Sequence, residues 1–260
     1  MRKYLFALSA AGLLLSAGTG IADEHKGGAE EANVASPMEI FTCKYNPGQD
    51  RSDLDAAIEQ WNKWGDKAGI SDYSAWILAP YYSGPEQDFD VIWLGGSAKA
   101  KDMGRAQDAW IGTGGAVQRA FDEAITCDSH GAFAVLRIKQ PPERDDADNL
   151  VVSFSDCNMA EDVSFEDLYM PLMKWGKYKG EHGSTAGMWV FFAAYGGGGE
   201  EYDFKWVRAY QNFADLGADW DQQNESGWRK ANDLFAGKVS CDSARAYLAT
   251  NVRRAKDNDE

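Results

Sequence analysis

The sequence predicts an α+β fold of two tandem β-α-β-β-α-β repeats, whose sheets pack together as an α/β barrel within one chain. Three observations predict it. The chain of 260 residues repeats itself, at an offset of about 113 residues. Its four cysteines form two pairs of equal spacing, and both halves show the same order of strand and helix patterns.

The internal repeat is clearest where each half is expected to form its second and third strands. The segment AWILAPYYSGPEQDFDVIW at 75–93 aligns with MWVFFAAYGGGGEEYDFKW at 188–206. The aligned identities are Trp76 with Trp189, Tyr82 with Tyr195, Asp90 with Asp203, and Trp93 with Trp206. Two copies joined by a short linker fit a duplicated domain better than a longer array of repeats.

The ends of the chain and its middle divide it into segments. Residues 1–22 begin with Arg2 and Lys3, continue as an apolar run and end in small residues, which is typical of a secretory signal peptide cut after Ala22. An uncleaved membrane anchor is the alternative. The further segments expected are a disordered acidic leader at 23–37, the first repeat at 38–139, a linker at 140–149, the second repeat at 150–254 and a disordered tail at 255–260.

The cysteines repeat with the duplication, because Cys43 and Cys127 are as far apart as Cys157 and Cys241. In a secreted chain, an even and matched set of cysteines favours disulfides over reactive thiols. Of the three pairings, the equal spacing favours Cys43–Cys127 and Cys157–Cys241, one bridge inside each repeat. Bridges between the repeats are the alternative.

Within the first repeat, strands are expected where β-branched and aromatic residues lie between turn residues, and helices where apolar residues recur every three or four positions. The expected elements are a strand at 38–45, a helix at 52–68 capped by Ser52, strands at 73–82 and 89–95, a helical region at 98–125 broken near 112–115, and a strand at 131–139.

The second repeat follows the same order. Its expected strands are at 150–157, 186–194, 202–209 and 244–252, and its expected helices are at 164–179 and 210–236. This is the ferredoxin-like arrangement, in which the last strand lies antiparallel beside the first. Cys43, late in the first strand, would therefore lie near Cys127, just before the last.

Both faces of the strand at 73–82 are largely apolar, although helices can cover only one face of a sheet. The other copy is the natural cover for the second face. In this architecture the chain resembles the dimeric α/β-barrel superfamily, which includes antibiotic-biosynthesis-type monooxygenases, muconolactone isomerases and stress-responsive barrel proteins. The resemblance covers residues 38–254 and rests on element order and repetition, so it implies a fold and no catalytic residue.

The net charge of −15 excludes the partners that need a basic surface. No basic cluster interrupts the acidity, so nucleic acid is not expected as a partner. No second apolar segment approaches the length of a membrane span, so no stable membrane insertion is expected after cleavage. The mature chain is expected to be a monomer or a homodimer.

Motifs for metals and cofactors are missing from the sequence. It contains no CxxC, HExxH or GxSxG, and the glycine run at 195–202 lacks the GK[ST] ending of a phosphate loop. Haem-binding relatives of this architecture, the chlorite-dismutase-like and dye-decolourising-peroxidase-like proteins, need an axial histidine that usually lies on a helix. His25 falls in the leader, and neither His130 nor His182 is expected on a helix. No cofactor and no metal are therefore predicted.

The duplicated aromatic residues are the main candidates for a binding site. Ten tryptophans in one chain require a large core or a stacking surface. Such residues either pack in the core or line a cleft for an apolar ligand. The ligand-binding candidates are Trp76, Tyr82, Trp93, Trp189, Tyr195 and Trp206 on strands, with Trp61 and Trp64 on the first helix.

Only weak catalytic candidates stand out, namely His182, Asp90 and Asp203. Each aspartate lies beside apolar residues at the start of a strand, where burial would raise the pKa of a carboxyl group. The simpler interpretation is that both aspartates cap a hairpin turn and that His182 is an ordinary loop histidine.

The leading hypothesis is a secreted or periplasmic protein without cofactor that holds a small apolar or aromatic molecule, or a partner surface, in an aromatic-lined cleft. One alternative is a cofactor-independent monooxygenase- or isomerase-like enzyme acting on an aromatic substrate. Another is a structural or interaction protein with a filled barrel. An enzyme requires a pocket with a buried ionisable group, a binding protein requires the pocket alone, and a structural protein requires neither.

Overall fold

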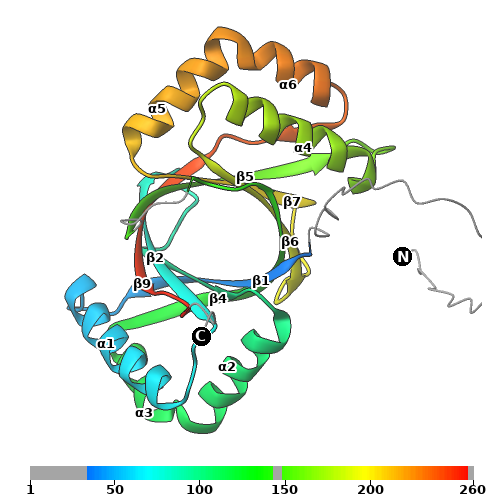
Figure 1. The fold of residues 1–260 in the computed structure, drawn as a ribbon. Coiled ribbons are helices and arrows are strands. Elements are labelled where there is room, and N and C mark those ends of the chain that lie inside the picture. Colours follow the sequence, from blue (N-terminus) through cyan, green and yellow to red (C-terminus); the bar gives the residue numbers. More distant parts are fainter. Residues whose placement is uncertain (1–33, 143–147, 257–260) are drawn as a thin grey trace, which may run out of the picture. The chain divides into compact units, whose positions relative to one another are not determined.

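A computed structural model describes residues 34–142 and 148–256 (Figure 1). The expected signal peptide, most of the expected leader with His25, and part of the expected linker and tail lie outside the described residues. The first strand begins at Ser36, two positions before the start expected at residue 38.

The first half of the chain alternates strands and helices in the order β1 (Ser36–Tyr45), α1 (Arg51–Lys67), β2 (Tyr73–Tyr82), β3 (Val91–Ser97), α2 (Ala100–Thr113), α3 (Gly115–Ala124) and β4 (Ile125–Lys139). Helix α1 is capped by Asp50 rather than by Ser52, because the Asp50 side chain accepts a hydrogen bond from the Ser52 backbone N–H. Strand β4 begins at Ile125 rather than at residue 131, because its pairing with β1 continues through Cys127 beyond a bulge. His130 therefore lies in a strand.

The second half contains β5 (Asn149–Met159), α4 (Phe165–Glu181), β6 (Gly187–Tyr195), β7 (Phe204–Tyr210), α5 (Phe213–Gln222), a π-helical turn (Gln223–Gly227), α6 (Trp228–Phe235), β8 (Val239–Cys241) and β9 (Arg245–Arg253). Helix α4 starts in a capping box, in which Ser164 and Asp167 each accept from the other's backbone N–H. The helical region expected at 210–236 begins at Phe213, and the π-helical turn interrupts it between α5 and α6.

The predicted fold class, two tandem ferredoxin-like repeats with their sheets packed together, is wrong. The strands form one antiparallel sheet in the order β7-β6-β4-β1-β3-β2-β9-β5-β8, and β7 also pairs with β5, so the sheet closes into a barrel. The pairs β4–β6 and β2–β9 join the halves by backbone hydrogen bonds. Separate sheets would expose edge strands with unpaired backbone groups, and closure removes those edges. The apolar strand faces indicate only what each face packs against, whereas the pairing of the edge strands decides that the sheet closes.

Apolar side chains from both halves fill the inside of the barrel. They include Leu78, Leu94, Phe133, Phe154, Phe191, Val207 and Tyr247, from β2, β3, β4, β5, β6, β7 and β9. Helices α1–α3 cover one side of the barrel from outside, and α4–α6 cover the opposite side (Figure 1). Each helical layer forms its own core against the outer face of the sheet.

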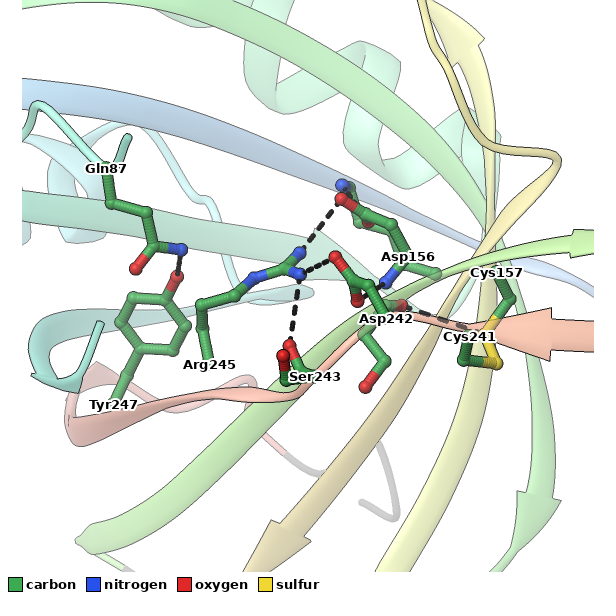
Figure 2. A network of polar contacts seen from close by, with 10 residues as sticks. Gln87, Asp156, Cys157, Cys241, Asp242, Ser243, Arg245 and Tyr247 are labelled. Atoms are coloured by element: carbon green, nitrogen blue, oxygen red, sulfur yellow. Dashed lines mark hydrogen bonds and ion pairs between the residues drawn. A yellow bond between two sulfur atoms is a disulfide. The ribbon is translucent and has the colours of Figure 1, made fainter. Parts of the chain in front are cut away.

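A polar network lies where β5 ends and β9 begins (Figure 2). Arg245 binds Asp156 at 2.9 Å and also contacts Asp242, and the second oxygen of Asp156 lies 2.6 Å from the ammonium of Lys205. These charges are paired with one another, so the network holds strands together and offers no free group to a ligand. Beside it, the Gln87 side chain, from the loop between β2 and β3, donates to the Tyr247 hydroxyl at 2.8 Å and so ties the two halves.

The structure contains the two predicted disulfides. Cys43–Cys127 links β1 to β4, and Cys157–Cys241 links β5 to β8, each across a sequence separation of 84 residues. On the chain-entropy model, each bridge restricts the unfolded chain by about 4.5 kcal/mol. Disulfides of this kind persist in oxidising compartments outside the cytosol. Among the described residues, no helix combines the length and the apolar character needed to cross a membrane.

Candidate functional site

A cleft of about 940 Å³ lies between the outer face of the first half's strands and helices α1–α3. A volume of this size suits a small organic molecule. Every element of the first half contributes to it. The lining residues are Glu39, Phe41, Cys43, Trp61, Trp64, Ile70, Tyr73, Trp93, Ala106, Gln107, Trp110, Ile111, Gln118, Phe121, Asp122, Ile125, Thr126, Cys127 and His130.

Aromatic rings in near-perpendicular pairs form much of the cleft wall. The centroids of Trp61 and Trp93 lie 4.8 Å apart with an interplanar angle of 87°, and those of Trp64 and Trp110 lie 5.2 Å apart at 80°. Phe121 packs edge to face against both Trp93 and Trp110. Edge-to-face pairs are the favoured geometry for aromatic rings, so the wall is well held without a ligand.

A buried carboxylate lies at the sheet side of this aromatic cleft. Glu39 is only 7% exposed, and alternation along β1 places it on the outer face with Phe41 and Cys43. Three side chains that can be uncharged lie within hydrogen-bond distance of this carboxylate. The Tyr73 hydroxyl lies 2.6 Å from Oε1, while His130 Nε2 and the Gln107 amide lie 2.8 Å and 3.3 Å from Oε2.

Tyr73 acts as a fixed donor to this carboxylate. Burial and the adjacent negative charge of Glu39 raise the pKa of Tyr73 well above its usual range, so the phenol stays protonated. Its oxygen in turn accepts from the Trp93 indole N–H at 3.1 Å. The hydroxyl crosses directly over Gly95 of β3, where an added Cβ would lie 1.7 Å from the Tyr73 oxygen. Only glycine at position 95 allows the Tyr73–Glu39 bond.

His130 lies between the carboxylate and the open part of the cleft. Its ring stacks on Phe41 with a centroid distance of 3.7 Å, and its side chain is 49% exposed. When Nε2–H donates to Glu39, Nδ1 is the nitrogen left to accept a proton. A carboxylate that orients an imidazole in this way is the arrangement of a general base.

The second half lacks this constellation. At the aligned positions, Ser153, Ala186, Arg208 and Ala244 stand where the first half has Glu39, Tyr73, Gly95 and His130. Its helical layer instead contains the ion pair of Lys179 with Asp219, at 2.8 Å and only 1% and 5% exposed. Burial lowers the pKa of Lys179, and the Ser184 hydroxyl also donates to Asp219. This pair is sealed in the core.

The structure separates the predicted ligand-binding residues. Trp61, Trp64 and Trp93 line the cleft. The other candidates lie elsewhere: Trp76 and Trp189 pack against the barrel core, Trp206 packs against the core of the second half, and Tyr82 and Tyr195 are 56% and 80% exposed.

The predicted catalytic candidates do not line the cleft. Asp90 accepts a hydrogen bond from the Tyr45 backbone N–H at 2.9 Å, and Asp203 accepts from that of Met159 at 2.7 Å. The two aspartates therefore perform the same capping role in the two halves. His182 directly follows α4, is exposed, and has its Nδ1 2.8 Å from the Tyr178 carbonyl oxygen.

The sequence pattern did not single out Glu39 or Tyr73, and it indicated only that His130 lies outside the helices. The aligned identities pointed to other positions, because Glu39, Tyr73 and His130 differ between the two halves. A list of positions where one copy has a polar or glycine residue that the other lacks would have included Glu39, Tyr73, Gly95 and His130.

Comparisons with known proteins agree with the fold. No protein-family model and no curated protein sequence matches the chain. Similar solved structures include a candidate monooxygenase from Fusobacterium nucleatum subsp. nucleatum (7% identity, TM-score 0.54, 86% of this chain and 95% of that one). They also include an anthrone oxidase-like protein (14%, 0.51, 87% and 96%) and a candidate chlorite dismutase (14%, 0.51, 84% and 95%). At these identities the likeness shows the fold alone, and it confirms the predicted resemblance in architecture to the dimeric α/β barrels, with no specific family.

A haem does not suit the residues that the structure describes. In the described ranges, neither histidine lies on a helix: His130 belongs to β4 and His182 follows α4. His130 is stacked on Phe41 and bonded to Glu39, and His182 is turned toward its own helix. Nor does any group of three histidine, cysteine, aspartate or glutamate residues among the described ones form a metal site.

We predict that the Tyr73→Phe variant is less stable and less sensitive to alkaline pH. Loss of the donor leaves the buried carboxylate of Glu39 poorly satisfied, at a cost of about 1–3 kcal/mol. In the native protein Tyr73 keeps its proton, whereas in the unfolded chain it ionises above about pH 10. Stability should therefore fall as pH rises past that point, by up to about 1.4 kcal/mol per pH unit, and the variant should lack this contribution.

Urea unfolding at pH 8, 9, 10 and 10.5 measures both effects. The control is Tyr82→Phe, which makes the same chemical change at an exposed residue. An alkaline pH dependence in Tyr73→Phe equal to that of the parent protein would contradict the assigned role of Tyr73.

Proposed function

We propose that this chain is a small-molecule-binding protein whose ligand, largely apolar or aromatic, occupies the cleft under α1–α3. The observation that carries the proposal is the combination of a ligand-sized volume with aromatic walls and one buried polar cluster. Known small-molecule sites share this composition, with apolar walls for affinity and few polar groups for orientation. Inside the barrel, the apolar side chains of both halves pack against one another instead.

Filling the cleft should abolish binding. Ala106 lines the cleft from α2, so Ala106→Leu places three further carbons in the ligand's space. Titration with the neutral aromatic ketone 2-tetralone, followed by quenching of tryptophan fluorescence, should show saturable binding to the parent protein. In Ala106→Leu the Kd should rise at least about tenfold.

The matched control is Ala116→Leu, the same substitution at an exposed position of α3. It should bind as the parent protein does. Equal binding by both variants, or quenching that does not saturate, would place the ligand outside this cleft.

A second candidate function is favoured by the Glu39–His130 pair. We propose that the pair catalyses proton transfer on the bound molecule, as an isomerase-like enzyme would. His130 Nδ1 takes a proton from an acidic C–H bond, and the electron pair of that bond stays on the ligand as an enolate. When the proton on Nδ1 exchanges with solvent and a solvent-derived proton is delivered to the same carbon, the result is hydrogen exchange, and delivery of a proton to another carbon of the enolate gives isomerisation. Glu39 stabilises the imidazolium that forms in between.

Hydrogen exchange tests this candidate without requiring the natural substrate. In D₂O, the protein should accelerate replacement of the α-hydrogens of 2-tetralone by deuterium, which ¹H NMR measures directly. The His130→Gln variant should lose at least about 100-fold of the acceleration, because a positioned base contributes that much or more. His182→Gln is the control at a histidine outside the cleft. No acceleration by the parent protein would leave the binding function and remove the enzymatic one.

We further propose that the protein acts in the periplasm or outside the cell after removal of residues 1–22, without a cofactor and as a monomer or homodimer. The two disulfides support an oxidising compartment. Protein purified from its own secretory compartment should begin at Asp23, with a mass four hydrogens below that of the reduced chain. Native mass spectrometry gives this mass and the number of chains together. A chain that keeps its first 22 residues, or that carries four free thiols, would contradict the location.

A further inference from the structure

The charge of the cleft has one sign. Among its described lining residues, Glu39 and Asp122 carry carboxylates, and none is a lysine or an arginine. His130 contributes a positive charge only when it is protonated. Glu39 is buried and is otherwise bonded to the neutral groups of Tyr73 and Gln107. A buried anion without a cationic partner is expensive unless something compensates its charge.

The cations around the cleft are occupied with other groups. Arg253 lies 5.4 Å from the Trp61 ring centroid, but it binds the Asp66 carboxylate and the Asn62 side chain and does not line the cleft. Arg105, on α2, pairs with Asp102 and Asp72. Lys44, next to the first disulfide, pairs with Asp88. None of these three compensates the charge of Glu39.

The aromatic walls supply the second half of a cation site. Trp61 and Trp93 meet at 87°, Trp64 and Trp110 meet at 80°, and all four rings line the cleft. Phe121 packs edge to face against both Trp93 and Trp110. Aromatic rings beside a carboxylate attract organic ammonium groups by cation–π and ion-pair interactions together.

We propose that the ligand of this cleft carries a positive charge, as an organic ammonium group attached to an apolar or aromatic body. The inference rests on the proposed binding function, since it requires the cleft to be the ligand site. The ammonium group is placed within reach of Glu39, and the apolar body lies against the tryptophans. An anionic ligand would meet the like charge of Glu39, and a neutral one would leave that charge uncompensated.

Three probes of one shape and different charge test this. They are 4-(trimethylammonio)phenol, 4-tert-butylphenol and 4-hydroxybenzenesulfonate, which share a ring and a tetrahedral para substituent of charge +1, 0 and −1. Calorimetric titration of the full mature chain should give a Kd for the cation about tenfold below that of the neutral isostere, with the anion weakest. The preference should persist at 0.5 M NaCl, where attraction to the acidic surface is screened.

Two glutamate variants assign the preference to the cleft. Glu39→Gln removes the charge while keeping an acceptor, and it should remove the ion-pair part of the preference, leaving only the smaller part that the aromatic walls supply. Glu59→Gln, the same change at an exposed residue of α1, should keep the full preference. The three probes on the unaltered protein decide the sign of the preference even where Glu39→Gln does not fold.

The outcomes separate the two proposals. If the neutral probe binds as tightly as the cation, or more tightly, the charge inference is overturned and the binding function stands. A cation preference that is undiminished in Glu39→Gln would also overturn it, because Glu39 would then not be its source. Failure of all three probes to bind would remove the binding function together with the inference.

Discussion

Backbone pairing between the two halves is the constraint on which this structure depends. The β2–β9 and β4–β6 ladders turn two sets of strands into one closed sheet, so no long edge is left exposed. Closure also decides where a ligand can be held. One face of every strand must point into the barrel, and a small barrel is filled by its own side chains. The cleft among the described residues accordingly lies on the outer face of the strands, under helices α1–α3.

Within the first half, one contact orders the polar part of that space. The Tyr73 hydroxyl passes over β3 to reach Glu39 on β1, and Gly95 on the strand between them leaves room for it. The same oxygen accepts from Trp93, so one hydroxyl couples the carboxylate to the aromatic wall. His130, on the other side of β1, then completes the carboxylate's partners. Hydrogen bonds to a charged group are stronger than hydrogen bonds between neutral groups, so they hold these side chains in place.

Much of the local structure could be predicted from the sequence because it depends on local signals. Helical periodicity located α1 and α4, turn residues located the hairpins, and cysteine spacing identified both bridges. Closure of the sheet was not predicted, because it depends on pairing between residues such as Leu78 and Ala249 that no local pattern links. The cleft was predicted in part: Trp61, Trp64 and Trp93 belong to it, whereas Trp76 and Trp189 lie on the opposite strand face. A shift of one residue along a strand moves a side chain from one face of the sheet to the other, and tryptophan can be buried on either face.

The identities between the aligned halves mark the scaffold. Asp90 and Asp203 make the same backbone contacts, and each half has its own disulfide, because both halves need the same strand ends fixed. A binding site has no such need to occur twice. In the second copy the carboxylate position holds Ser153, and the helical layer closes over the internally paired Lys179 and Asp219. In the first copy the carboxylate of Glu39 faces a cleft instead of a lysine. The second half contains a buried lysine as the partner of its carboxylate. In the first half, the proposal is that the ligand supplies this positive charge.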